Sequence, residues 1–137
     1  QAMIDDLPQN KFKRALAAKK PQIGLWMTLT SPVATEIVAG AGFDWFLLDM
    51  EHSANDLPEI VAQLRAAEGG TAEPIVRVPW NEPVAVKRVL DQGARSLLFP
   101  FVQSAEEAGD DQQAPLWCKA VVLHEKRYGN AYQVTTD

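Results

Sequence analysis

The chain has 137 residues, of which 47% are apolar and 23% charged, and this balance is typical of a single globular domain with a buried core. Its four Trp and five Phe residues need burial, which excludes disorder as the main state, and no apolar run approaches the ~18 residues of a membrane span. The net charge of −5 argues against a protein that binds nucleic acid through its phosphates.

The first third of the chain is predicted to hold a helix from residue 11 to about residue 20, a buried strand over 22–29 and a helix from 32 to about 39. Asn10 and Ser31 carry side chains that accept a hydrogen bond from the first turn of a helix. Pro32 suits the first helical position, and Gly40 follows where the second helix is expected to end.

The same alternation continues with three further strands, over residues 45–49, 74–78 and 96–101. Asp56 and Glu59 have the spacing of a capping box, which predicts a helix that ends at Gly69. Asn81 is the expected N-cap of the next helix, which ends at Gly93.

Strands that are apolar along their whole length and alternate with helices predict an α/β fold with a parallel sheet. Two architectures have this order of elements: an open, doubly wound sheet, and part of a (β/α)8 TIM barrel. A whole barrel needs ~250 residues, and this chain contains about half of the strand-helix units.

The chain changes character after residue 108. Ser104 and Glu107 form one more capping-box pattern, but the polar residues 109–113 interrupt that helix near its start. Residues 119–124 are a possible fifth strand, and the rest of the tail shows no clear period. We therefore expect half of a barrel over residues 1–108 and an unassigned tail over 109–137.

Polar side chains gather where the second and third predicted strands end. Asp49 ends the second strand, and Glu51 and His52 follow it directly. Arg77 lies inside the apolar third strand. Because parallel α/β folds bind ligands at the carboxyl ends of their strands, we expect the acid, the histidine and the arginine to converge there.

Each of these residues has more than one interpretation. A buried Arg77 needs a partner, which is either Asp49 in a structural ion pair or the carboxylate of a substrate. His52 is either an ordinary loop residue or a general base that a neighbouring carboxylate orients. Asp49, Glu51 and His52 are also a candidate metal cluster, although the sequence offers no second group of ligands.

Other features carry less information. Asp91 is most simply a surface acid at a helix end, and Trp26 and Trp80 are most simply core or pocket wall. The sequence has no Walker loop, no dinucleotide-binding glycine motif, no nucleophile elbow and no zinc signature. The single cysteine, Cys118, excludes an internal disulfide and fits the cytoplasm, and the first residues lack the pattern of a signal peptide.

Four stretches together carry a resemblance to a known family: residues 21–26, 39–52, 76–81 and 90–94. Their order and spacing resemble the HpcH/HpaI aldolases, which include 4-hydroxy-2-oxoheptanedioate aldolase and 2-dehydro-3-deoxyglucarate aldolase. The resemblance covers about residues 10–108. It implies a (β/α)8 barrel and a class II aldolase, which joins pyruvate or hydroxypyruvate reversibly to an aldehyde.

The resemblance also implies a cofactor and an assembly. In this family Mg²⁺, Mn²⁺ or Co²⁺ chelates the 2-oxoacid and stabilises the enolate. The family's metal ligands are a glutamate and an aspartate on later strands, and no residue of this chain matches them. The expected partners are a 2-oxoacid, an aldehyde and further copies of the chain in a hexamer or trimer, with no nucleic acid or membrane.

Five residues match positions with roles in the family. Arg77 matches the arginine that binds the pyruvate oxygen, and Trp26 matches a pocket-wall position. His52 and Asp91 match a pair that activates a metal-bound water as acid and base. In the family, the aspartate of this pair can come from a neighbouring subunit. Asp49 matches an acid that positions the arginine and the water shell of the metal.

Because the chain contains about half of the strand-helix units of a barrel, three explanations remain open. The sequence is part of a longer working protein, or the gene is truncated or altered after residue 108, or two copies of the chain assemble into a barrel-like whole. The rival to the aldolase is accordingly a non-catalytic half barrel or assembly partner, and a related lyase of the pyruvate/phosphoenolpyruvate group is a third possibility. An open half barrel would also leave two unprotected sheet edges.

Overall fold

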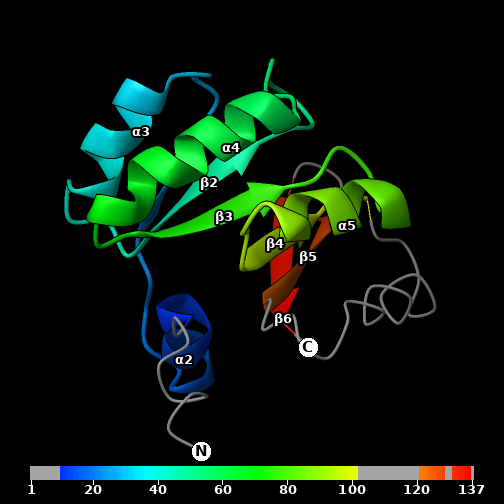
Figure 1. Cartoon of the computed structure of the whole chain (residues 1–137). Coiled ribbons are helices and arrows are strands. Elements are labelled where there is room, and N and C mark those ends of the chain that lie inside the picture. Colours follow the sequence, from blue (N-terminus) through cyan, green and yellow to red (C-terminus); the bar gives the residue numbers. More distant parts are fainter. Residues whose placement is uncertain (1–9, 102–120, 129–130, 137) are drawn as a thin grey trace, which may run out of the picture.

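A computed structural model describes residues 10–101, 121–128 and 131–136, and six strands in it form one sheet in chain order (Figure 1). The strands are β1 (Gly24–Met27), β2 (Trp45–Asp49), β3 (Glu73–Arg77), β4 (Ser96–Phe99), β5 (Val121–Tyr128) and β6 (Ala131–Thr136). Strands β1 to β5 pair in parallel, and β6 pairs antiparallel with β5. The predicted α/β fold with parallel strands is therefore confirmed.

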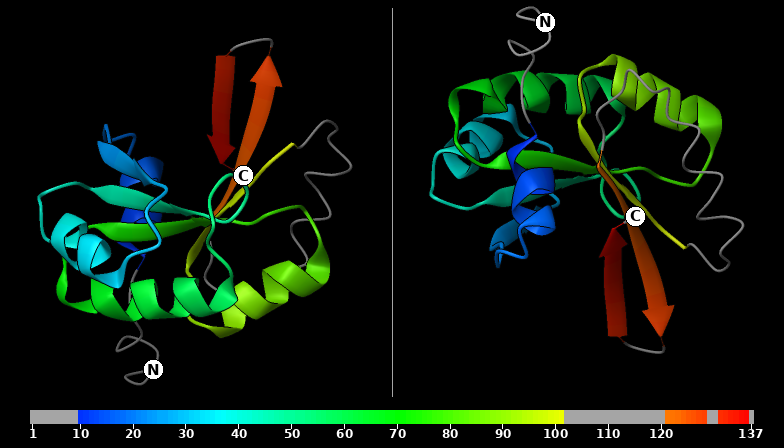
Figure 2. Two further views of the ribbon diagram at one scale, coloured as in Figure 1. Left: turned by 90° about the horizontal axis from the view of Figure 1, so that it is seen from above. Right: turned by 90° about the horizontal axis from the view of Figure 1, so that it is seen from below.

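The described helices are α2 (Lys11–Ala17), α3 (Pro32–Ala39), α4 (Leu57–Ala66), which a short 3₁₀ turn η1 (Ala67–Gly69) extends, and α5 (Pro83–Asp91). Helices α3, α4 and α5 all lie on one side of the sheet (Figure 2). A doubly wound sheet would place its helices on both faces. Sequential strands with all the described crossover helices on one side are the geometry of the first half of a (β/α)8 barrel, which decides between the two predicted architectures.

Neighbouring residues of one strand face opposite sides of the sheet and build two separate apolar layers. Phe46 and Leu48 of β2 face the helices and pack in a cluster with Ile60 of α4 and Val89 of α5. Leu47, between them, faces the other side, where it joins a smaller cluster with Ile75, Leu98 and Phe12 of α2. Through Phe12, helix α2 therefore packs on the sheet face opposite to α3, α4 and α5.

Among the described helices, the predicted starts are correct with one exception. The side chain of Asn10 accepts a hydrogen bond from the N–H of Lys13 at 2.9 Å, and Ser31 caps α3 in the same way. Asn81 is not the cap of α5. Glu82 takes this place because Pro83 occupies the first turn of the helix, which makes the residue before the proline the N-cap.

The strand bounds differ from the prediction at their ends. Strand β1 spans only four of the eight residues expected over 22–29, β3 begins and ends one residue earlier than expected, and β4 ends at Phe99. The expected fifth strand exists as β5, although residues 119 and 120 lie outside the described part, as does the helix expected after Ser104.

The β5–β6 hairpin lies in the tail that had no predicted structure beyond residue 124. Backbone pairing between antiparallel strands requires no apolar alternation, so a polar segment carries little periodic signal.

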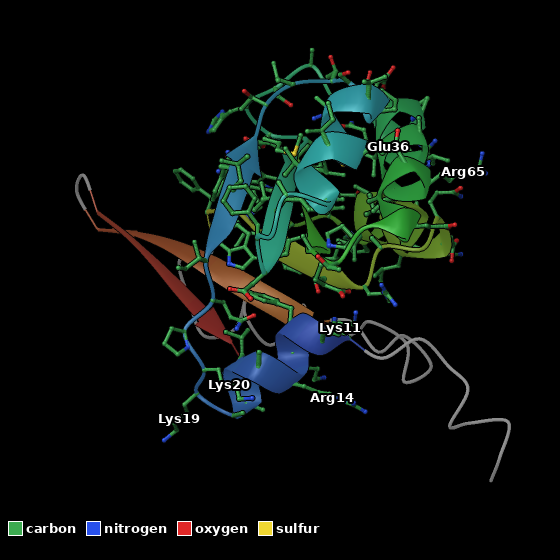
Figure 3. The ribbon with its side chains drawn as sticks, turned by 90° about the vertical axis from the view of Figure 1, so that its left-hand side faces the viewer. Lys11, Arg14, Lys19, Lys20, Glu36 and Arg65 are labelled. Atoms are coloured by element: carbon green, nitrogen blue, oxygen red, sulfur yellow. The ribbon has the colours of Figure 1, made fainter. Side chains whose placement is uncertain are left out.

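Charged side chains lie on the outside of the helices, as Figure 3 shows for Lys11 and Arg14 of α2, Glu36 of α3 and Arg65 of α4. All four are exposed. Among the residues described, no helix is long and apolar enough to cross a membrane.

Candidate functional site

Asp49 and Arg77 form a buried ion pair at the carboxyl ends of β2 and β3. The two residues are direct partners in the register of these strands. Arg77 Nε donates to Asp49 Oδ1 at 3.0 Å, and Arg77 Nη2 donates to Asp49 Oδ2 at 2.5 Å. Their side chains are only 7% and 1% exposed. The structure therefore confirms the predicted pair, in the two-pronged geometry that is strongest for arginine and carboxylate.

The loop after β2 adds Glu51 and His52 to this pair. Glu51 Oε2 lies 3.0 Å from Arg77 Nη1, and Glu51 Oε1 lies 3.5 Å from His52 Nε2. The His52 side chain is 69% exposed, in contrast to the buried arginine. Glu51 thus links a buried cation to a histidine that solvent reaches, and the predicted convergence of acid, histidine and arginine is confirmed as a matter of geometry.

Trp26 of β1 completes the cluster. Its Nε1 donates to Asp49 Oδ2 at 3.1 Å, and the Cζ atom of Arg77 lies 4.6 Å from the centroid of its ring. This distance is typical of a cation–π contact. Trp26 is 41% exposed, so it forms one wall of the cluster and is not part of the core.

The surroundings of Asp49 keep it ionised. Burial by itself raises the pKa of a carboxyl group, but hydrogen bonds from Arg77, Trp26 and the backbone N–H groups of His52 and Glu51 outweigh it and lower the pKa of Asp49 to about 2. A carboxylate with so low a pKa is a poor proton acceptor near neutral pH. Asp49 therefore acts chemically as an anchor for the arginine.

The structure does not bring Asp91 to this cluster within one chain. Asp91 is exposed at the last residue of α5. In a strand-helix unit the helix runs back along the sheet, so its last residue lies at the amino ends of the strands. Arg77 lies at their carboxyl ends, and one chain cannot join the two side chains.

Trp80 was expected in the core or a pocket wall, but it is 56% exposed. Its ring stacks on that of Phe101, with centroids 5.8 Å apart.

The candidate metal cluster of Asp49, Glu51 and His52 is not supported. Among the residues described, no group of three His, Cys, Asp or Glu side chains could hold a metal ion. The carboxylates of Asp49 and Glu51 both lie against Arg77 instead.

Glu51 is the residue to which sequence reasoning assigned no definite role. The available signal was its position two residues after Asp49, since alternate residues of an extended segment project to one side.

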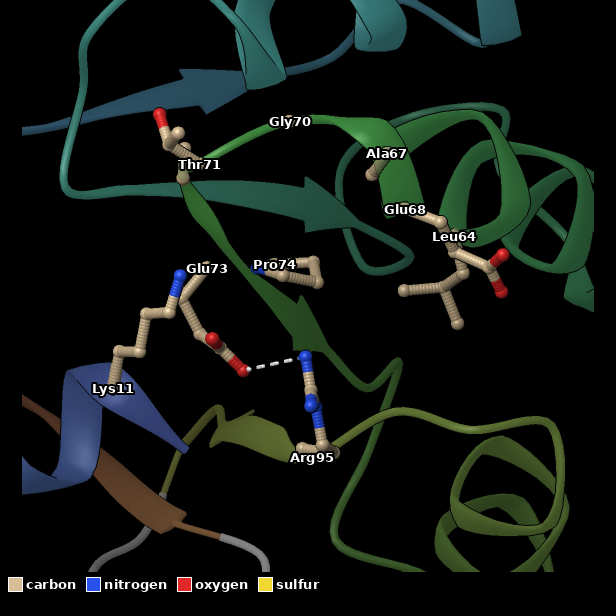
Figure 4. Close-up of a pocket in the computed structure, with 10 residues that line it drawn as sticks. Lys11, Leu64, Ala67, Glu68, Gly70, Thr71, Glu73, Pro74 and Arg95 are labelled. Carbon is tan, nitrogen blue, oxygen red and sulfur yellow. Dashed lines mark ion pairs between the residues drawn. The ribbon is translucent and has the colours of Figure 1, made fainter. Parts of the chain in front are cut away.

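A cavity of about 240 Å³ lies at the other end of the sheet (Figure 4). Glu73 and Arg95 meet there, with Glu73 Oε1 3.3 Å from Arg95 Nη2. Burial raises the pKa of Glu73, and the charges of Arg95 and Lys11 offset this only in part. Because ligands bind at the carboxyl ends of barrel strands, this cavity at the amino ends is a structural feature and not the candidate site.

Several known proteins similar to this chain are named as aldolases. A 5-keto-4-deoxy-D-glucarate aldolase from Enterobacter sp. (strain 638) is 53% identical over 106 residues, which are 77% of this chain and 41% of that relative. A solved HpcH/HpaI aldolase/citrate lyase family protein from Burkholderia cenocepacia J2315 matches with a TM-score of 0.70 at 46% identity, over 73% of this chain and 40% of that one.

A second solved structure, the HpcH/HpaI aldolase from Desulfitobacterium hafniense DCB-2, matches with a TM-score of 0.64 at 36% identity, over 70% of this chain and 38% of that one. The chain thus spans about two fifths of the length of these relatives. The family model described as HpcH/HpaI aldolase/citrate lyase matches residues 22–115, and the chain belongs to this family.

Proposed function

We propose that this chain is the catalytic amino-terminal half of a class II pyruvate aldolase, with residues 1–108 as the half barrel and 109–137 as a separate tail. The reaction is the reversible aldol addition of pyruvate or a close 2-oxoacid to an aldehyde. The observation that carries the proposal is the cluster of Asp49, Arg77, Glu51 and His52 at the carboxyl ends of the strands. The relative named 5-keto-4-deoxy-D-glucarate aldolase supports a keto sugar acid as the compound that is cleaved.

Arg77 and His52 have complementary tasks in this reaction. Removal of a proton from the methyl group of pyruvate leaves an enolate, whose oxygen carries the negative charge. The Arg77 guanidinium stabilises that oxygen electrostatically. His52, which is exposed beside Glu51, accepts the methyl proton and returns it in the reverse direction. The enolate carbon then forms the new bond to the carbonyl carbon of the aldehyde, whose C=O π electrons move to its oxygen, and this oxygen takes up the proton that His52 holds.

Asp49 and Trp26 act on the arginine. Asp49 holds two guanidinium nitrogens, and the guanidinium carbon lies over the Trp26 ring, so both contacts restrict the position of the guanidinium group. Asp91 belongs to the proposal only as a residue that reaches the His52 of a neighbouring subunit. This role requires a homo-oligomer, a trimer or hexamer, which we propose together with a cytoplasmic location.

A divalent metal ion, Mg²⁺, Mn²⁺ or Co²⁺, also belongs to the proposal through the family. The described residues do not by themselves fit such an ion, because no three of their acidic, histidine or cysteine side chains form a ligand group. By the resemblance, the ligands would be the glutamate and the aspartate of the later strands, which no residue of this chain matches.

The test is the exchange of pyruvate methyl protons with deuterium, measured by NMR with Mn²⁺ or Mg²⁺ and a working full-length enzyme that contains this chain. We expect Arg77→Lys to slow the exchange by about 10²-fold, the loss typical of one misplaced oxyanion donor. His52→Gln should slow it by about 10²-fold or more, as for a lost general base.

Arg65→Lys is the matched control, because Arg65 is exposed on α4, and its exchange rate should equal that of the unchanged chain. Unchanged exchange in Arg77→Lys or His52→Gln would show that the assigned role is wrong. No metal-dependent exchange by the unchanged full-length enzyme would favour the non-catalytic half barrel.

A further inference from the structure

The loop between β2 and α4, residues 50–56, carries Glu51 and His52 and is attached to Asp49 on two sides. The Asp49 carboxylate accepts hydrogen bonds from the N–H groups of Glu51 and His52, at 2.9 and 3.2 Å. The backbone carbonyl of Asp49 accepts a second pair of bonds, from Ser53 Oγ and from Asn55 Nδ2, the latter at 2.9 Å. Asn55 is 3% exposed, so this anchor is protected from water.

Asn55 is itself held by a chain of buried side chains. Its Oδ1 accepts from Gln63 Nε2 of α4 at 2.7 Å. Gln63 Oε1 lies 3.0 Å from the hydroxyl of Thr35 on α3. Gln63 and Thr35 are both fully buried. The chain of hydrogen bonds therefore runs from α3 through α4 to the carbonyl of Asp49.

Burial of three polar side chains costs free energy unless each of their hydrogen bonds is made. Apolar residues would pack two helices against a sheet without this requirement. Such a network has fixed directions, since an amide presents its donor and acceptor at set angles. Its last bond ends on Asp49, whose carboxylate holds Arg77. The positions of α3 and α4 therefore help to fix the position of Asp49 in the candidate site.

We propose that Asn55 is a positioning residue of the candidate active site: it holds the 50–56 loop so that Glu51 and His52 stay beside Arg77. The inference rests on the proposed function, because it concerns the same cluster. Asn55 touches none of the reacting atoms and acts through the loop.

Hydrogen exchange of backbone amides in the 137-residue chain tests the inference without any assay of activity. In Asn55→Ala, the N–H groups of Glu51 and His52 should exchange at least about tenfold faster, because the loop that carries them is no longer held against Asp49. The indole N–H signal of Trp26 should also shift, since its acceptor is the same carboxylate.

Asn10→Ala is the matched control. Asn10 is a buried asparagine with bonds to Lys13, Arg95 and Ser96, and it lies at the amino ends of the strands. Its loss should destabilise the chain without accelerating exchange at Glu51 and His52 beyond the change in global stability. Equal acceleration in both variants, or none in Asn55→Ala, overturns the inference.

A second variant covers the case in which Asn55→Ala does not fold. Thr35→Val keeps the branched shape and removes only the hydroxyl at the far end of the network. The same two amides should exchange about threefold faster, and unchanged exchange overturns the inference.

Pyruvate proton exchange then separates this inference from the proposed function. If the unchanged chain exchanges pyruvate protons, Asn55→Ala should lower kcat about tenfold and leave KM within about twofold, as expected when groups needed only in the transition state move. An unchanged kcat overturns the inference. If the unchanged chain shows no exchange, the proposed function fails, and the amide measurement still decides the role of Asn55.

Discussion

At the residue scale, the Asp49 carboxylate uses both oxygens on fixed donors. Oδ1 accepts from Arg77 Nε and from two backbone N–H groups, and Oδ2 accepts from Arg77 Nη2 and Trp26 Nε1. Desolvation of a charge this deeply buried is expensive, and only such a complete set of partners compensates for it. Asp49, which the sequence predicts as an acid at a strand end, therefore contributes to the stability of the fold as well as to the candidate site.

Asp49→Asn should lower the free energy of unfolding by about 3 kcal/mol, the low end of the cost of removing one partner of a buried ion pair. Glu51 still lies against Arg77 and limits the loss. Urea unfolding at neutral pH measures the effect. Glu36→Gln, an exposed carboxylate on α3, is the control and should change stability by less than about 0.5 kcal/mol. An equal effect of both substitutions would contradict the expectation.

The ionisation of Asp49 makes the free energy of unfolding depend on pH. The pKa of Asp49 is lowered to about 2 in the folded chain, so its contribution is complete above its ordinary pKa and is lost as the pH falls through the folded value. This contribution is about 2 kcal/mol, lost between about pH 4 and pH 2. In Asp49→Asn this part of the acid-induced loss should be absent.

At the element scale, a proline in the first turn marks the starts of α3, α4 and α5. Each is preceded by a residue whose side chain can accept hydrogen bonds: Ser31, Asp56 or Glu82. The carboxylate of Glu82 accepts from the N–H groups of Val84 and Ala85, both at 2.9 Å. The position of the proline was therefore a better guide to the cap than the residue type of Asn81.

Glu82→Ala should lower the melting temperature, whereas Asn81→Ala, one residue earlier, should leave it nearly unchanged. The backbone N–H groups of Val84 and Ala85 lower the pKa of Glu82, so its capping contribution should be lost as the pH falls below the ordinary range of a glutamate. Thermal unfolding of both variants at neutral and acidic pH checks this. A larger loss in Asn81→Ala would restore Asn81 as the cap.

At the scale of the whole molecule, the two ends of the sheet treat buried carboxylates differently. At the carboxyl ends Asp49 is fully hydrogen-bonded, and its pKa is lowered. At the amino ends Glu73 is 4% exposed, and its Oε1 receives no hydrogen bond from the described residues. Burial therefore raises the pKa of Glu73. The carboxyl ends of the strands thus stabilise the charged form of Asp49, whereas burial at the amino ends disfavours the charged form of Glu73.

The raised pKa of Glu73 predicts a loss of stability as the pH rises. A carboxyl group whose pKa is higher in the folded chain stabilises it while protonated, and this contribution disappears as the pH rises through the folded value. Glu73→Gln should remove the fall in the free energy of unfolding. Glu68→Gln, an exposed carboxylate that lines the same cavity, should leave the fall intact. A pH profile of urea unfolding that is identical in all three chains would contradict the prediction.

The order of the elements as far as β4, most caps and the polar cluster of Asp49, His52 and Arg77 could be predicted from the sequence, because these depend on local chemistry and on the rule that strand ends share one edge. Several features depended on the tertiary structure. The side on which α3, α4 and α5 pack decided for a half barrel over a doubly wound sheet. Packing also brought Gln63 and Thr35, 28 residues apart, into one network behind the site. It separated Asp91 from His52, because contacts across the sheet leave no mark in the local sequence.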